Sequence, residues 1–175
     1  MDAWSPDGRT ILYHLDATRQ LWGLPLEGDR KPFLVYEPAG GTVDEPSFSL
    51  DGKWIAFNST ESGADQVYVV PFPTTGAKWQ VSVGGGVQPR WRRDGRELYF
   101  LAPDGKMMAV DLPVGNAFEA GTPHALFQTN VVPDDSVDQY VVTGDGQRFV
   151  MMTPVGAAQS YAIQVITDWP GLLKK

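Results

Sequence analysis

One short phrase occurs four times along this chain. It consists of an aromatic or apolar residue, two variable positions, Asp-Gly, a polar residue and an apolar run, and its copies read WSPDGRTILY, FSLDGKWIAF, WRRDGRELYF and, more loosely, VTGDGQRFVM. The intervals between successive copies are 44, 43 and 51 residues, measured between Asp7, Asp51, Asp94 and Asp145. A period of this length indicates a repeat protein, in which each repeat is one supersecondary unit.

Each repeat contains short runs rich in β-branched and aromatic residues, separated by Gly, Pro, Asp or Asn, which is the pattern of β-strands joined by turns. No run has the apolar period of an amphipathic helix. The first three repeats predict four strands each, at 3–5, 11–15, 20–26 and 32–36, then 46–49, 54–59, 66–72 and 78–83, then 88–92, 97–101, 106–112 and 124–128. The fourth repeat predicts only three strands, at 139–142, 147–153 and 161–167.

Four short strands per repeat form the blade of a β-propeller. We therefore predict an all-β single domain of about four blades of four antiparallel strands, with blades at 1–37, 38–84, 85–129 and 130–175. The last blade is predicted to lack its outer strand. Because an open arc would leave apolar sheet faces and a free strand edge in water, we expect either a tight ring of four blades or, preferably, self-association into a larger ring.

The Asp-Gly pairs are predicted to form tight turns between the innermost strand of each blade and the next strand. In the segment Ser5-Pro6-Asp7-Gly8 the proline suits the second position of a type I turn, and glycine suits the fourth. Metal ligation by these aspartates is not expected, because each one belongs to a different blade. Aromatic and apolar residues at two repeat positions are predicted to fill the space between blades: Trp4, Phe48 and Trp91, and then Trp22, Tyr68 and Met108.

These phrases resemble the WD-like repeat of TolB-type propellers, which also occurs in the propeller domains of prolyl-oligopeptidase-like peptidases, and the resemblance covers nearly the whole chain. More narrowly, four segments are similar to the C-terminal ends of bacterial transmembrane serine/threonine protein kinases: WQVSVGGGVQPRWRRDGRELYFLAPDGKMMAVDL, FEAGTPHALFQT, DGQRFVM and ITDWPGLLKK. In those kinases a cytoplasmic kinase domain precedes a membrane helix and a C-terminal propeller with more blades than four. The resemblance implies a sensory or binding propeller in an extracytoplasmic or periplasmic position.

Catalytic motifs are missing from the sequence. It contains no Gly-rich phosphate loop, HRD or DFG for phosphoryl transfer, no GxSxG for a serine hydrolase and no cysteine. The two histidines, His14 and His124, are far apart and lack metal-ligand spacing. We therefore expect a chain that is not an enzyme. Two alternatives stay open, an enzyme such as a lyase or glycosidase with its site in the central channel, and an isolated half-propeller with no activity of its own.

The net charge of −7 and the absence of a large Lys/Arg cluster make nucleic acid an unsuitable partner. No apolar run is long enough to span a membrane, and the start of the sequence does not have the pattern of a signal peptide. No cofactor is expected. Acidic residues gather at Asp44-Glu45 and at Asp134, Asp135 and Asp138, and these could bind Ca²⁺, but without the spacing of a calcium loop we predict solvated loops.

The ligand of the propeller is predicted to be a protein, a peptide or a small molecule. One face of a propeller carries the connections between blades together with the loops between second and third strands, and variable loops on a rigid frame commonly bind ligands. Here that face would consist of 16–19, 37–45, 61–65, 84–88, 129–139 and 154–160. The starts of the inner strands would bring four predicted ligand contacts near the central channel, namely Glu45, Gln88, Arg90 and Gln139.

Overall fold

The computed structural model describes the 175-residue chain except for residues 1–2, 16–18, 113–116, 135–136, 156–159 and 168–175. Within the described residues the chain forms fifteen strands and no helix, so the predicted all-β fold is confirmed. None of these residues belongs to a helix that could cross a membrane. The strands form four antiparallel sheets, each made of strands that follow one another in the sequence.

Each of the first three sheets is a four-stranded meander, the blade of a propeller. The first blade consists of β1 (Ala3–Trp4), β2 (Thr10–Leu15), β3 (Gln20–Pro25) and β4 (Phe33–Tyr36). The second consists of β5 (Val43–Phe48), β6 (Trp54–Ser59), β7 (Gln66–Pro71) and β8 (Trp79–Gln80). The third consists of β9 (Val87–Trp91), β10 (Glu97–Leu101), β11 (Lys106–Asp111) and β12 (His124–Gln128). In the described residues the fourth blade has three strands, β13 (Tyr140–Val142), β14 (Arg148–Val155) and β15 (Ser160–Thr167).

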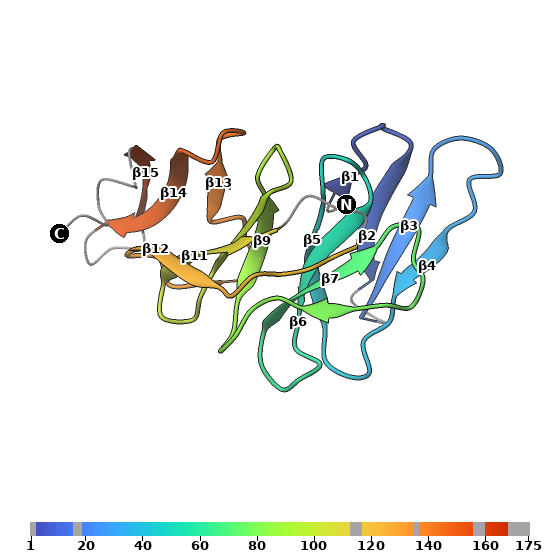
Figure 1. Cartoon of the computed structure of the whole chain (residues 1–175), viewed down its shortest axis with the longest axis horizontal. Coiled ribbons are helices and arrows are strands. Elements are labelled where there is room, and N and C mark those ends of the chain that lie inside the picture. Colours follow the sequence, from blue (N-terminus) through green and yellow to red (C-terminus); the bar gives the residue numbers. More distant parts are fainter. Residues whose placement is uncertain (1–2, 16–18, 113–116, 135–136, 156–159, 168–175) are drawn as a thin grey trace.

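The blades form an open arc. In Figure 1 the first blade lies at one end of the long axis of the molecule and the fourth blade lies at the other. The innermost strands, β13, β9, β5 and β1, follow one another from left to right across the middle of the view. The chain therefore does not close into a tight ring of four blades, and the larger ring formed by self-association stays a prediction.

The hydrophobic core consists of three layers, each between two neighbouring blades. Between the first and second blades, Leu12 and Leu21 pack with Ile55 and Phe57. The second layer joins Val67 and Val69 to Leu98 and Phe100, and the third joins Tyr99 and Leu101 to Phe149 and Met151. Successive residues of a strand point to opposite faces of a sheet, so each inner blade supplies side chains to two layers.

The prediction for the repeated aromatic positions is confirmed for four of the six residues. Phe48 and Tyr68 belong to the layer between the first two blades, and Trp91 and Met108 belong to the next layer. Trp4, in contrast, is 53% exposed. Its neighbour Ala3 packs against the layer between the first two blades, so Trp4 points to the opposite face of the first blade.

The Asp-Gly pairs form the predicted turns. In the first copy the Gly8 amide donates to the Ser5 carbonyl at 2.9 Å, and Gly8 has φ of 72°, a left-handed conformation that glycine adopts without strain. The Asp7 carboxylate accepts from the Ser5 hydroxyl at 2.5 Å and from the Arg9 amide at 3.0 Å. An additional turn of this kind, which the repeat pattern did not predict, joins β10 to β11 at Asp104-Gly105.

Candidate functional site

The inner strands border a groove of about 820 Å³ on the inside of the arc. Every blade contributes to its walls. The charged and aromatic side chains that line it include Trp4 and His14 from the first blade, Asp44 and Glu45 from the second, Arg90 from the third and Asp138 from the connection before the fourth.

Two of the inner strands have an unusual backbone at the same repeat position. Glu45 and Gln88 both precede a proline, and their φ angles of 51° and 58° lie in the left-handed region that residues other than glycine rarely adopt. Near each residue the pairing with the neighbouring strand shifts register, as in a β-bulge. Such bulges change the direction in which a side chain points, and they are frequent beside functional sites.

Gln88 and Gln139, two of the four predicted contacts, come together, but they are buried. Gln88 is 0% exposed, and its side-chain amide donates to the carbonyl oxygens of Asp134 at 2.6 Å and Val137 at 2.7 Å. Its side-chain oxygen accepts from the Gln139 backbone amide at 2.9 Å. The Gln88 carbonyl accepts from the Tyr140 hydroxyl at 2.7 Å, and burial raises the pKa of Tyr140, which keeps this hydroxyl protonated. Both glutamines therefore support a wall of the groove, and their contact with a ligand stays a prediction.

Arg90 and Glu45, the other two predicted contacts, line the groove itself. The Arg90 guanidinium forms an ion pair with Asp138 and donates to the Pro89 carbonyl at 3.1 Å, so the chain fixes its direction. Its partner Asp138 is largely exposed, which leaves the pair open to solvent and to a bound molecule. Ligand contact by Arg90 and Glu45 stays a prediction.

His14 is a groove residue that the sequence did not reveal. It lies at the end of β2, and its Nε2 atom is 4.0 Å from Asp44 Oδ1 on the neighbouring blade. Histidine spacing in the sequence does not reveal this arrangement, because the acidic partner comes from another repeat. The signal that could have found it is topological, since the end of a second strand lies beside the start of the next inner strand.

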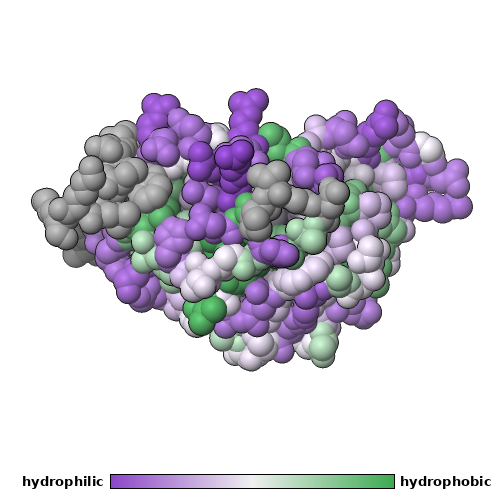
Figure 2. All heavy atoms as spheres, viewed as in Figure 1, coloured by the Kyte–Doolittle hydropathy of each residue, from purple (hydrophilic) through white to green (hydrophobic). Residues whose placement is uncertain are grey.

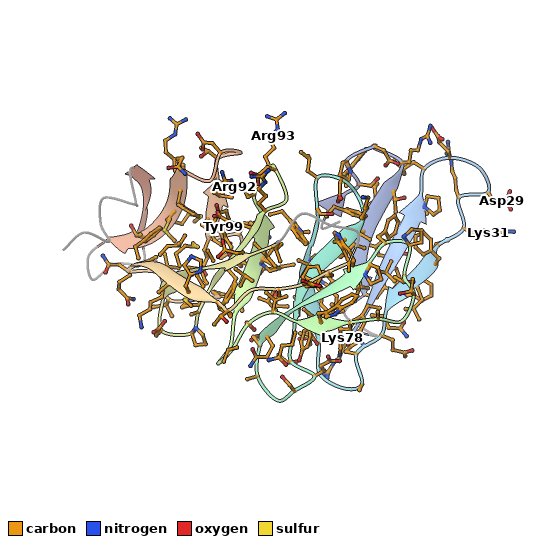
Figure 3. All side chains as sticks on the ribbon, in the orientation of Figure 1. Asp29, Lys31, Lys78, Arg92, Arg93 and Tyr99 are labelled. Carbon is orange, nitrogen blue, oxygen red and sulfur yellow. The ribbon has the colours of Figure 1, made fainter. Side chains whose placement is uncertain are left out.

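The opposite end of the groove is aromatic and cationic. The strands β1, β5 and β9 all end there, and the residues that follow them bring Leu50 and Arg93 close to Trp4. Arg93 is exposed and forms no ion pair within the described residues. Figure 3 shows it projecting from the turn after β9, while Arg92 and Tyr99 lie beneath it.

Within the described part of the chain, no group of three or more acidic or histidine side chains is placed to hold a metal ion. One of the acidic residues considered for Ca²⁺, Asp135, lies outside that part, as do 16–18, 135–136 and 156–159 of the predicted binding face. Of the others, Asp138 pairs with Arg90, and the Asp134 carbonyl accepts from Gln88. The expected lack of a cofactor stays a prediction.

No protein-family model matches the chain. A segment of 69 residues is 32% identical to an uncharacterized protein of Agrobacterium fabrum, and it covers 38% of the chain and 23% of that protein. Among solved structures, TolB from Acinetobacter baumannii is similar over 96% of the chain, with a TM-score of 0.68 and 19% identity. The periplasmic gluconolactonase PpgL from Pseudomonas aeruginosa is similar over 94% of the chain, with a TM-score of 0.54 and 15% identity.

These likenesses define a TolB-like β-propeller fold. The chain spans 41% of the TolB chain and 55% of the gluconolactonase chain. At such low identities the likeness establishes the fold alone.

The expectation that the chain is not an enzyme is corrected by these structures. One protein with this fold is named a gluconolactonase, and two Bacteroides proteins with the same fold carry the name 6-phosphogluconolactonase. A gluconolactonase is a hydrolytic enzyme, so the fold is compatible with catalysis. The absence of kinase and serine hydrolase motifs does not establish a chain without activity.

Proposed function

We propose that the groove inside the arc is a binding site for a protein segment, a peptide or a small molecule. The observation that carries this proposal is that the first three blades and the connection before the fourth all contribute charged or aromatic side chains to one groove of about 820 Å³. Concave sites with a few convergent polar groups are the usual form of ligand sites. The core layers between blades hold these groups on a rigid frame.

The two ends of the groove suit different groups of a ligand. Arg93 has no ion pair within the described residues, so its guanidinium is available to a carboxylate or phosphate. The exposed ring of Trp4 offers an apolar surface nearby. At the other end Asp44 and Glu45 suit an amine or hydroxyl groups. A peptide, which carries groups of both kinds, fits this distribution well.

The more specific role, that of the sensory propeller of a bacterial membrane kinase, is part of this proposal. It is supported by the sequence phrases that resemble the C-terminal regions of such kinases. In that role the ligand of the groove would be the signal.

A second candidate function is hydrolysis of a lactone. Two observations favour it, the similarity of the fold to proteins named gluconolactonases and the neighbouring His14 and Asp44 in the groove. A neutral imidazole oriented by a carboxylate can take a proton from water, whose oxygen then attacks the lactone carbonyl. The ring C–O bond breaks, and the ring oxygen takes up a proton as the acid forms.

Binding can be tested by thermal-shift and calorimetric titration with short peptides and sugar acids. We expect saturable binding that Arg93→Ala and Glu45→Gln each weaken at least about tenfold, the loss of about 1.4 kcal/mol. Lys31→Ala is the matched control, because Lys31 pairs with Asp29 in the hairpin between β3 and β4, at the far end of the molecule from Arg93 in Figure 3. Equal effects of the groove variants and the control would contradict the proposal.

Hydrolysis can be tested separately by adding gluconolactone and following acid release at constant pH. If the groove is an active site, turnover exceeds the spontaneous rate, and His14→Gln abolishes it while Lys31→Ala leaves it unchanged. Turnover that survives His14→Gln would rule out this second candidate and leave the binding proposal intact.

A further inference from the structure

The first blade has one apolar face that no described part of the chain covers. Its other face packs on the second blade through Leu12 and Leu21. The outward face carries Trp4 and Leu34, which are 53% and 40% exposed, and Tyr13, which is half-buried. In Figure 2 apolar atoms reach the surface at the right-hand side of the molecule, beside β3 and β4.

The same face of the second blade is an interface between blades. The first-blade residues Trp4, Ile11 and Tyr13 lie 44 positions before Phe48, Ile55 and Phe57. Those three residues of the second blade all belong to the core layer against the first blade. The outward face of the first blade thus carries large apolar side chains at the positions where the second blade contacts its predecessor.

The last blade presents the complementary face at the opposite end of the arc. Phe149 and Met151 on β14 point into the core layer against the third blade. The neighbouring residue Val150 is half-buried and Met152 is 38% exposed, because alternate residues of a strand point to opposite faces. On β13, Val141 is 57% exposed. One chain therefore carries both halves of an interface between blades, one at each end.

We propose that the chain associates head to tail with a second copy, in which the first blade of each copy packs on the last blade of the other. This contact repeats, between molecules, the packing that each chain builds three times within itself. Two copies related by a twofold axis form both contacts at once and close a ring of eight blades, within the range of known propellers. In that ring the grooves of the two copies face a common channel.

The first test is the mass in solution, measured by analytical ultracentrifugation over a wide range of concentrations. We expect a species of twice the chain mass of 19.2 kDa. Trp4→Glu on the first blade and Met152→Glu on the last blade should each shift the protein to the monomer. Val83→Glu is the matched control, since Val83 is 80% exposed in the connection between the second and third blades, away from both end blades, and it should still dimerise.

Mixing distinguishes head-to-tail contact from other modes of pairing. A mixture of the Trp4→Glu and Met152→Glu chains retains one intact contact, between the last blade of the former and the first blade of the latter. We therefore expect the two monomeric variants to form a heterodimer together. Circular dichroism and thermal unfolding establish that each variant is folded, and Leu34→Glu replaces Trp4→Glu if that chain is not. A wild-type monomer at all concentrations, or a mixture that stays monomeric, would overturn the proposal.

Discussion

The Gln139 backbone amide donates a hydrogen bond to the buried side chain of Gln88, 51 residues earlier in the sequence, at 2.9 Å. The amide group of Gln88 in turn lies 3.2 Å from the side-chain oxygen of Gln139. The Gln139 side chain also accepts from the Asp134 amide at 2.8 Å and donates to the Val132 carbonyl at 2.7 Å. Two glutamines at the same repeat position therefore connect the third and fourth blades and hold the connection between them.

Removal of the Gln88 side chain should loosen this connection. Gln88→Ala leaves the carbonyl oxygens of Asp134 and Val137 and the Gln139 amide without their partner, at a cost of about 1–3 kcal/mol in the free energy of unfolding. Urea denaturation measures the loss. The control Gln147→Ala, at an exposed position, should change stability by less than about 0.5 kcal/mol. Equal effects would mean that the buried network contributes nothing.

The turns of the third and fourth blades offer a comparison of two glycines. Gly95 and Gly146 both have φ of 72°, but a Cβ atom on Gly95 would meet no atom within 4 Å, whereas one on Gly146 would lie 2.2 Å from the Tyr99 hydroxyl. Gly95→Ala should cost about 1–2 kcal/mol for the left-handed backbone alone. Gly146→Ala should cost roughly 1–3 kcal/mol more, because it also displaces Tyr99. Chemical denaturation of both variants measures the loss in the free energy of unfolding. Equal losses would contradict the predicted clash.

The first and second blades share a charged cluster near their outer strands. Lys78 donates to the Tyr36 hydroxyl at 2.8 Å and pairs with Glu61, and its ammonium lies 4.7 Å from the centre of the Tyr68 ring. Desolvation opposes ionisation of Glu61, but hydrogen bonds from Lys78 and Tyr36 leave its pKa below the usual value. Desolvation and the hydrogen bond to Glu61 raise the pKa of Tyr36 to about 12, so this tyrosine is neutral at physiological pH.

This cluster predicts a pH-dependent stability. Because the pKa of Glu61 is lowered in the folded state, its contribution is present above the ordinary glutamate pKa and is lost as the pH falls through the folded value. Glu61→Gln should therefore destabilise the chain by about 1–3 kcal/mol at neutral pH. Urea denaturation from neutral pH down to about pH 3 should show this difference shrinking. A difference that does not change with pH would contradict an ionic role for Glu61.

Phe118 should be important for stability although it lies outside every strand. It is 8% exposed, and its ring centre lies 5.2 Å from that of Trp54 and 5.3 Å from that of Trp79. Phe118→Ala should cost about 3–5 kcal/mol through loss of burial and the cavity left behind. The neighbouring Glu119→Ala, at an exposed position, is the control and should be nearly neutral. Thermal and urea denaturation test both, and a small effect of Phe118→Ala would mean that the loop collapses to fill the space.

Much of the fold could be predicted because each local signal agreed with the repeat. The predicted strands 97–101 and 124–128 coincide with β10 and β12. Strand β5 differs, because it begins at Val43 rather than at the predicted Pro46. Its ladder continues past the bulge around Glu45, and proline is tolerated at such irregular positions.

The site was harder to predict because the bulges in the inner strands and the contacts with other blades decide which side chains reach the groove. Gln88 stands where the pattern placed a channel residue, but it has a left-handed backbone and is buried against Asp134, Val137 and Gln139. His14 and Asp44 belong to different repeats, so no spacing rule connects them. Trp4 has the same repeat position as Trp91, yet it is exposed because its surroundings depend on the neighbouring blade.

The stacking of blades in a row also affects how the chain unfolds. Each sheet gains its burial from its immediate neighbours, so the stability of such an array is close to a sum of local terms, and opening can start at either end. In a separate chain we expect the amides of β6 and β10, which lie in blades with a neighbour on both sides, to exchange with solvent most slowly. The strands of the end blades should exchange sooner, and closure of a ring would make exchange more uniform along the chain.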